Sequence, residues 1–224
     1  MTIKVLTSGS KGNVTAVEVG DELILIDCGK AVSWSLERLN YRLPRAILLT
    51  HEHGDHAKAA ADWLKRSVDV YLTAGTCAAL ELKRRYNLHT ITAGASFRIQ
   101  GLTVEAIPAI HDATEPVNFI LSDNEDRILY ATDTGAIPTL NGDFTKIIVE
   151  ANFSEPVLLN SNLDDYQKRR VLENHLSIEQ AITFLKAYPT AEVHLIHVSA
   201  RHGNGAEFVK RAIEATGNEN ITVN

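Results

Sequence analysis

The chain has 224 residues, of which 45% are hydrophobic, so it is long enough to bury one sizeable core, and we expect a single domain over residues 1–224. Its net charge of −6, from 22 basic and 28 acidic residues, excludes a broad cationic field, so any contact with nucleic acid must be local. The first residues lack the long apolar stretch of a signal peptide or membrane span, and Cys28 and Cys77 are too few for a disulfide framework. We therefore predict a cytoplasmic protein with no membrane partner.

Strand-like and helix-like patterns alternate along most of the chain. Three predicted strands with turn signals between them open it as a β-meander, and a strand-rich segment spans residues 96–130. Ser177 and Gln180 form a capping box at the start of a late helix. The other predicted strands and helices are strands 3–7, 14–19, 23–26, 46–49, 68–72, 146–150, 193–196 and 221–223, and helices 32–40, 57–66, 76–86, 178–187 and 206–215.

The order of these elements predicts an α/β protein. A β-rich segment followed by an α/β segment occurs twice, which indicates two similar halves. We expect two mixed β-sheets packed face to face with helices outside. Polar clusters fall where predicted strands end, and loops at such positions are where a rigid sheet places ligands.

One short segment carries three histidines and an aspartate. His51-Glu52-His53-Gly54-Asp55-His56 comes directly after the apolar strand 46–49. Imidazole nitrogen and carboxylate oxygen are the donors that first-row divalent metals prefer. His51 and His53 are two residues apart and project to one side, whereas Asp55 and His56 are adjacent and point toward a second ion. The segment therefore predicts a site for two metal ions.

Three residues at the ends of later strands complete this site. His111 is the expected third ligand of the first ion, Asp133 would bridge both ions, and His197 would complete the ligands of the second ion. His202 is the alternative to His197. Two ions about 3.5–4 Å apart would lower the pKa of a bridging water, which then attacks in line as hydroxide.

As a set, these residues resemble the metallo-β-lactamase superfamily, whose His-x-His-x-Asp-His signature matches residues 51–56. Its other motifs are matched in order by Asp27, His111, Asp133 and His197. The resemblance implies the αββα sandwich fold, and it places Asp27 behind a metal-binding histidine. We expect two divalent ions as cofactors, with zinc as the first choice and manganese as the second.

Further stretches resemble the YycJ-type (WalJ) group of DNA exonucleases in this superfamily, namely residues 8–13, 111–116 and 168–177. RNase Z is the next nearest resemblance. It implies that His175, in a turn before the capped helix, acts near the scissile phosphate and protonates the leaving oxygen. The expected contacts to the substrate phosphate are Lys168, Arg169, Arg170, Ser8 and Asn13.

The predicted function is a di-metal hydrolase that cleaves phosphodiester bonds in nucleic acids or nucleotides, with Asp55, Asp133 and His175 as catalytic residues. Because the chain is compact and acidic, a cyclic mononucleotide phosphodiesterase, similar to the phage anti-Pycsar enzymes, is the alternative. A thioester or lactone hydrolase is the more distant one, and it would give His175 no phosphate to serve.

A non-catalytic or redox relative is disfavoured, because no ligand is missing and His53 is not replaced by glutamate as in redox relatives. The resemblance allows a homodimer. We expect His89 and His194 to be structural, and Cys28 to be a small buried residue.

Overall fold

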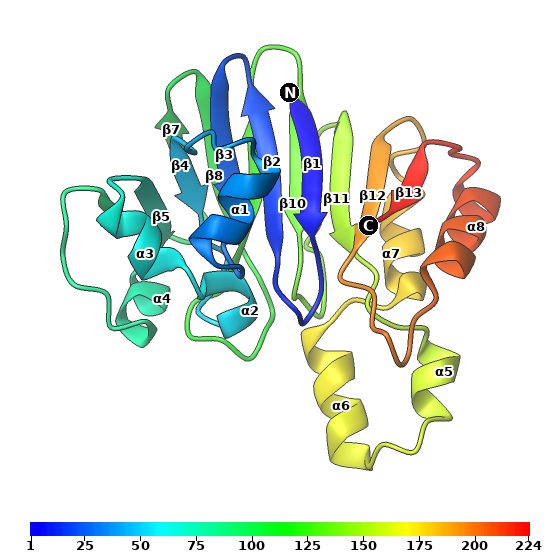
Figure 1. Ribbon diagram of the computed structural model, residues 1–224. Helices are drawn as coiled ribbons and strands as arrows, with labels where there is room; N and C mark the ends of the chain where they lie inside the picture. The colour runs from blue at the N-terminus through cyan, green and yellow to red at the C-terminus, as the bar shows by residue number, and fades with distance from the viewer. The chain divides into compact units, whose positions relative to one another are not determined.

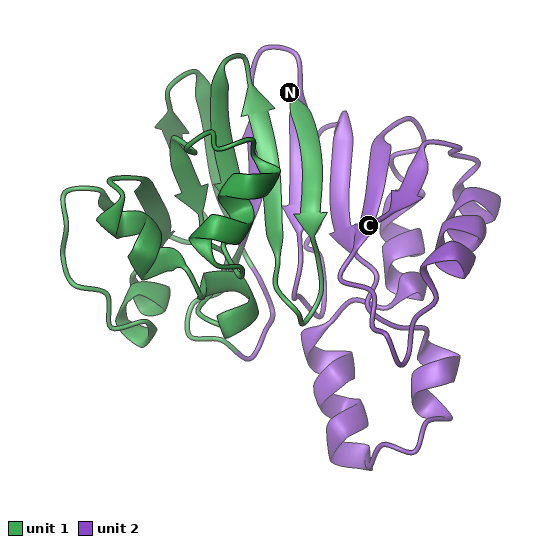
Figure 2. Ribbon diagram, in the orientation of Figure 1, with its two compact units in different colours: residues 1–108, 113–117 green, residues 109–112, 118–224 purple.

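The computed structural model describes residues 1–224 and divides them into two compact units, coloured separately in Figure 2. Unit 1 comprises residues 1–108 and 113–117, and unit 2 comprises residues 109–112 and 118–224. The strands form two mixed sheets, one of six and one of seven strands, which confirms the predicted α/β class. The single domain over residues 1–224 stays a prediction.

Unit 1 begins with the predicted meander and continues with parallel strands. Its elements are β1 (Thr2–Thr7), β2 (Val14–Val19), β3 (Glu22–Ile26), α1 (Val32–Arg38), β4 (Ala46–Leu48), α2 (Gly54–Ala57), α3 (Ala60–Lys65), β5 (Asp69–Thr73), α4 (Ala74–Ala79), β6 (Leu88–Ile91), β7 (Ser96–Ile99) and β8 (Leu102–Pro108). The first sheet has the order β1 to β6, antiparallel from β1 to β3 and parallel from β3 to β6. Figure 1 shows α1 and α3 over this sheet.

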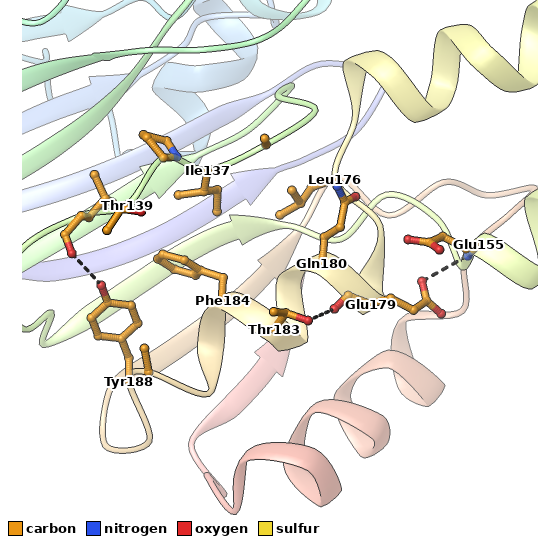
Figure 3. Close-up of a pocket in the computed structure, with 13 residues that line it drawn as sticks. Ile137, Thr139, Glu155, Leu176, Glu179, Gln180, Thr183, Phe184 and Tyr188 are labelled. Atoms are coloured by element: carbon orange, nitrogen blue, oxygen red, sulfur yellow. Dashed lines mark hydrogen bonds between the residues drawn. The ribbon is translucent and has the colours of Figure 1, made fainter.

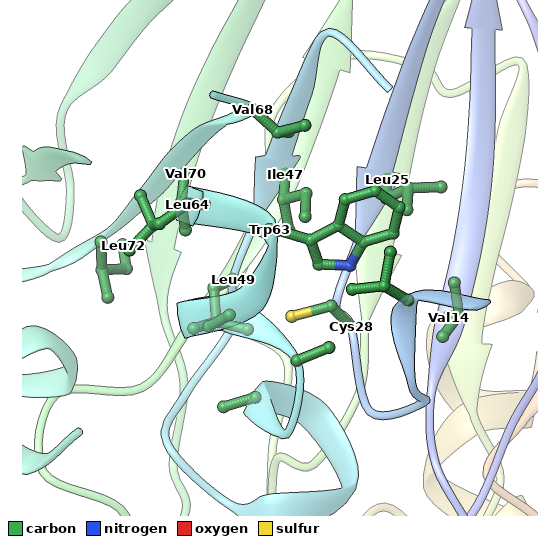
Figure 4. Close-up of a cluster of buried hydrophobic side chains, with 14 of the residues drawn as sticks. Val14, Leu25, Cys28, Ile47, Leu49, Trp63, Leu64, Val68, Val70 and Leu72 are labelled. Carbon is green, nitrogen blue, oxygen red and sulfur yellow. The ribbon is translucent and has the colours of Figure 1, made fainter. Parts of the chain in front are cut away.

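Helices cover one face of the first sheet, and the side chains on that face form a buried core. Successive side chains of a strand point to opposite faces, so every second residue joins the same core. The buried cluster includes Leu23 and Leu25 of β3, Ile47 of β4 and Leu49 just after it, and Val70 and Leu72 of β5. Figure 4 shows part of this cluster. Trp63 of α3 lies in the middle of this cluster and is fully buried.

Replacement of Trp63 by alanine should lower the free energy of unfolding by about 3–5 kcal/mol, because it removes a large buried side chain and leaves a cavity. Denaturant unfolding followed by circular dichroism measures this loss. Tyr86→Ala is the control, since Tyr86 is 80% exposed and its removal should change stability by less than about 0.5 kcal/mol. A comparable loss in both variants would contradict a core centred on Trp63.

Unit 2 holds five strands of the seven-stranded sheet, and the last four of these strands are parallel. Its elements are β9 (Val117–Ser122), β10 (Arg127–Ala131), β11 (Lys146–Glu150), α5 (Glu155–Leu159), α6 (Asp165–Asn174), α7 (Ile178–Leu185), β12 (Glu192–Ile196), α8 (Gly205–Thr216) and β13 (Ile221–Val223). Strands β9 to β13 are adjacent in sequence order, with β9 antiparallel to β10. Helix α8 packs against α7 and β13. The predicted capping box of Ser177 and Gln180 starts α7.

Several element boundaries differ from the prediction for local reasons. The predicted helix 57–66 begins only at Ala60, as α3, because the chain bends where the Ala59 N–H bonds to the Cys28 carbonyl. The predicted helix 76–86 ends at Ala79, and Glu81 follows in a left-handed conformation with φ 51°. The prediction lacks α2, β6, α5 and α6. None of the helices combines the length and apolar composition that crossing a bilayer requires.

Candidate metal centre

The histidine-rich segment of unit 1 forms the end of the loop after β4 and the first residues of α2. The rings of His51 and His53 are 4.7 Å apart in an edge-to-face arrangement, and the rings of His51 and His56 are 4.2 Å apart. His56 Nε2 lies 3.7 Å from a carboxylate oxygen of Asp55. Unit 1 therefore brings the four predicted ligands of the signature into one cluster.

Asp27 lies behind this cluster and is fully buried. Its Oδ2 is 2.7 Å from His56 Nδ1, and its Oδ1 accepts hydrogen bonds from the amide and hydroxyl of Thr50. Asp27 follows β3 with a φ of 63°, a left-handed conformation that aspartate tolerates better than most residues. The contact engages Nδ1 of the His56 ring and leaves Nε2 as the atom that would bind a metal.

Asn13 also points at His56. Its Nδ2 lies 2.9 Å from His56 Nε2 and 3.5 Å from Asp55 Oδ2, and the residue is 1% exposed. The structure thus places Asn13 among the predicted ligands. Ser8 is half-buried in the same turn. A contact of either residue with a substrate phosphate stays a prediction.

Unit 2 gathers four residues that are far apart in the sequence. Asp133 and His197 follow β10 and β12 in left-handed conformations, with φ values of 47° and 56°, and Asp133 Oδ1 is 3.0 Å from His197 Nδ1. The ring of His175 stacks on that of His197 at 5.5 Å and meets that of His111 edge-on at 5.4 Å. Three strand ends and the turn before α7 therefore converge on one cluster.

Glu150, at the end of β11, belongs to this cluster and is absent from the sequence prediction. It is fully buried, and its Oε1 lies 2.7 Å from His175 Nδ1 and 2.9 Å from His197 Nδ1. Its Oε2 accepts hydrogen bonds from the amides of Thr134 and Leu176. A carboxylate that ends an otherwise apolar strand is the signal for it, because a buried charge persists only with partners.

Glu150 and His175 form a charged pair. Burial alone lowers the pKa of His175, but the charge of Glu150 and hydrogen bonds to Asp133 and Glu150 outweigh it and raise that pKa to about 10. Burial raises the pKa of Glu150, but the charge and hydrogen bond of His175 outweigh burial and lower it. The pair is thus a carboxylate with an imidazolium.

Glu150→Gln should lower turnover about 10–100-fold, because the side chain that orients His175 and His197 loses its charge. In the metal-free protein the same change should lower the pKa of His175, so that the ring loses its proton at lower pH. Steady-state kinetics and an NMR titration of the histidines measure these effects. Glu125→Gln, at an exposed turn, is the matched control. An unchanged titration of His175 would contradict the pairing.

Helix α6 supports His111. The carbonyl oxygen of Asn174, at the end of α6, lies 3.0 Å from His111 Nδ1. Asp112 pairs with Arg170 of the same helix at 2.7 Å. Burial lowers the pKa of His111, which favours the neutral ring that a metal ligand requires. The contact with Asn174 leaves Nε2 as the atom that would bind a metal.

The predicted basic run is engaged within unit 2. Arg169 pairs with Glu173 at 2.8 Å, and Lys168 Nζ donates to the carbonyl of Leu159 at 2.8 Å. Arg170 is held by Asp112, as described above. The role of these three cations in binding a substrate phosphate stays a prediction.

The remaining histidines and Cys28 have structural contacts. His89 lies 3.0 Å from Asp69, and His194 bonds to a glutamate of its own strand. His202 forms backbone hydrogen bonds in the turn after β12. Burial raises the pKa of the Cys28 thiol, in keeping with a small core residue.

The cluster of unit 2 has a second interpretation. Asp133, Glu150, His175 and His197 each offer one ligand atom, and these atoms lie within 4.8 Å of one another. A divalent ion would need each ligand at about 2.0–2.2 Å. The 2.7 Å between Glu150 Oε1 and His175 Nδ1 is instead the length of a charge-assisted hydrogen bond. We therefore interpret these two as a pair beside the ligands.

A cavity of about 580 Å³ lies between residues 136–140 and α7 (Figure 3). Its walls are mostly apolar, with Ile137 and Phe184 facing Leu176, and none of the predicted metal ligands lines it. The charged lining residues are Glu155 and Glu179, of which Glu179 is paired with Arg211 at 2.6 Å, and no lining residue offers a positive charge to a phosphate. This cavity therefore does not suit the chemistry of the cluster.

Comparison with known proteins decides the family. The model of a family described as "Beta-lactamase superfamily domain" matches residues 23–198, a range that contains all the predicted metal ligands. The chain belongs to the β-lactamase superfamily. This membership, with the histidine and aspartate clusters of both units, confirms the predicted metallo-β-lactamase relationship and a hydrolase that uses divalent metal ions.

Individual relatives of this superfamily member agree. Exodeoxyribonuclease YycJ from Bacillus anthracis is 28% identical over 215 residues, which cover 87% of this chain and 81% of the relative. Exodeoxyribonuclease WalJ from Streptococcus pneumoniae serotype 2 is 26% identical over 217 residues, with coverages of 87% and 80%. The crystal structure of the metallo-β-lactamase fold protein YhfI from Bacillus subtilis matches with a TM-score of 0.78 at 17% identity, covering 99% of this chain and 95% of that one. These matches confirm the predicted fold and the resemblance to the YycJ and WalJ group.

Proposed function

We propose that this superfamily member is a di-metal phosphodiesterase whose ligand clusters in the two units together bind two divalent cations. The ligands assigned to the first ion are His51, His53 and His111, those assigned to the second are Asp55, His56 and His197, and Asp133 bridges. Zinc is the first candidate and manganese the second, because imidazole and carboxylate donors suit both.

The observation that carries this proposal is that, in both units, a carboxylate or carbonyl oxygen contacts Nδ1 of a histidine predicted to bind metal. A metal-binding histidine usually gives its other ring nitrogen to a carboxylate or carbonyl, which fixes the tautomer. The pairs are His56 with Asp27, His111 with the Asn174 carbonyl, and His197 with Glu150. When bound, divalent cations polarise a phosphate oxygen and lower the pKa of water.

His175 is the general acid of this proposal. Glu150 holds the ring through Nδ1 and keeps it protonated, so Nε2 carries the proton that the departing alkoxide of a phosphodiester requires. A thioester places a weaker demand on an acid, because a thiolate leaves without a proton. The pair therefore favours phosphodiester over thioester cleavage.

The substrate class that we infer is nucleic acid, because relatives that match over 87% of this chain are exodeoxyribonucleases. A cyclic mononucleotide is the second candidate, favoured by the net charge of −6 and by the ion pairs that engage Arg169 and Arg170. A homodimer stays a prediction.

A substrate panel tests the proposed function. Protein freed of metal with a chelator is reloaded with zinc or manganese and given cyclic mononucleotides, bis(p-nitrophenyl) phosphate, single-stranded and duplex DNA, RNA, a thioester and a lactone. We expect turnover of the phosphodiesters only after reloading. Turnover of the thioester or lactone, with none of the phosphodiesters cleaved, would overturn the proposal.

A further inference from the structure

A group of cationic residues beside a tryptophan lies on the surface of unit 1 and has no part in the proposed chemistry. It consists of Lys11, Lys30, Trp34 and Arg38, and we call it the α1 strip. Lys30 Nζ donates to the Lys11 carbonyl and lies 5.5 Å from the centre of the Trp34 ring. The guanidinium carbon of Arg38 lies 3.8 Å from the same ring, one helical turn along α1.

The α1 strip begins at the proposed metal ligands. Gly29 packs so tightly that a Cβ there would lie 1.7 Å from the carbonyl oxygen of Asp55, and its amide donates to the Asn13 carbonyl. Lys30 is the next residue, so the first cation of the strip adjoins the segment that carries Asp55 and His56. A linear ligand that extends from the metal ligands along α1 would contact Lys30 first and Arg38 last.

The strip keeps its positive charge. Neither of its lysines has a carboxylate partner. Arg38 meets Glu37 at 3.9 Å, and an ion pair between two exposed side chains at that distance contributes little. Arg42, by contrast, is paired with Glu18 at 2.6 Å. An uncompensated cationic strip on a chain with a net charge of −6 is suited to an anion that binds locally.

Trp34 gives the strip an aromatic platform. The indole packs against the hydrophobic core cluster on one side and carries the Arg38 guanidinium above its ring. Indole rings and guanidinium planes are the groups on which unpaired bases stack, whatever their sequence. A group of cations with a stacking platform matches the alternation of phosphate and base along a single strand.

We propose that the α1 strip binds a single-stranded nucleic acid, with phosphates at Lys11, Lys30 and Arg38 and a base stacked on the Trp34–Arg38 pair. This inference rests on the proposed function, because the strand held by the strip is the one cleaved at the adjoining metal site. The strip makes the substrate a polymer, since a cyclic mononucleotide is too small to occupy it and the metal site together. It selects an unpaired strand, because the bases of a duplex are already stacked within the helix.

Intrinsic tryptophan fluorescence of the metal-free full-length protein tests this binding without any hydrolysis. Of the two tryptophans, Trp63 is fully buried, so Trp34 reports on the strip. A 12-nucleotide strand, titrated at low salt, should quench the fluorescence of the wild type. In the double variant Lys30→Glu/Arg38→Glu the Kd should rise at least about tenfold. The slope of log affinity against log salt should become shallower by about 1.4, since each lost contact with a single strand contributes about 0.7.

The control variant is Lys83→Glu/Arg84→Glu, which makes the same change in net charge at exposed positions after α4 and should keep the wild-type Kd. Equal weakening in both double variants, unchanged binding in the strip variant, or binding of a blunt duplex as tight as that of the single strand would each overturn the inference. Strand binding through the strip without cleavage after metal loading supports the strip and contradicts the proposed function. Cleavage of bis(p-nitrophenyl) phosphate by a protein that binds no single strand would support the proposed function and contradict the role of the strip.

Discussion

His175→Ala is expected to lower kcat for an oligonucleotide about 10²–10⁴-fold, the range that a positioned general acid contributes. The side chain is 22% exposed, so part of the ring is accessible to a substrate, while Nδ1 is held at 2.7 Å from Glu150. Because the pair keeps the ring protonated well above neutral pH, the acid form is present throughout the working range and is lost only as the pH rises toward about 10.

The leaving group distinguishes an acid from a merely structural histidine. A p-nitrophenolate departs without a proton, so the variant should lose much less activity toward bis(p-nitrophenyl) phosphate than toward an oligonucleotide. His194→Ala, which removes a histidine that bonds to Glu192 of its own strand, is the control and should keep wild-type kinetics for both substrates. If the variant lost equal activity toward the two esters, His175 would not be the general acid. If it cleaved the oligonucleotide at the wild-type rate, the pair of Glu150 and His175 would have no part in the reaction.

The two ligand clusters differ in how readily the sequence reveals them. In unit 1 the donors of the signature lie within six consecutive positions, so residue type alone indicates a metal site. In unit 2 the partners of Glu150 are His197, which the pairing of β11 with β12 brings close, and His175, which follows α6. The sequence around a glutamate at the end of a strand does not indicate which distant residues it will contact.

Some elements of the fold can likewise be predicted from a short stretch of sequence, whereas others depend on contacts with distant residues. Residues 23–26 and 46–49 are continuous apolar runs in which every side chain is buried, and those strands are predicted within about one residue. Helix α6 has no buried residue, so it carries no apolar period that would reveal it. It is held by a capping box at Asp164 and by contacts such as that of Arg170 with Asp112.

The backbone conformation at the site also cannot be predicted from sequence patterns. Asp27, Asp133 and His197 all have left-handed conformations within two residues of the end of a strand, at a cost of about 1–3 kcal/mol each. Such strain persists only where the surrounding contacts enforce it, and here each side chain is turned back toward a histidine or a carboxylate of its own unit. The site thus follows from strand ends that bend sharply, which a strand pattern alone does not predict.

Asp133→Asn should lower turnover of every phosphodiester about 10²–10³-fold, because a carboxylate that bridges two cations is worth several kcal/mol of stabilisation in the transition state. Asparagine keeps the shape of the side chain and also tolerates the φ of 47°, so the fold should remain intact while the bridging charge is lost. In contrast to His175→Ala, the loss should not depend on the leaving group, because the cations act on the phosphate itself.

Metal binding gives this last prediction a readout that needs no substrate. Zinc stabilises the wild type by mass action, so its Tm should rise on loading, and Asp133→Asn should bind fewer than two equivalents and show a smaller rise. Asp143→Asn, at an exposed position before β11, should match the wild type in both measurements. If Asp133→Asn kept two tightly bound equivalents and full turnover, no shared carboxylate would join the two ions, and the assignment of both ligand sets to a single reacting centre would fail.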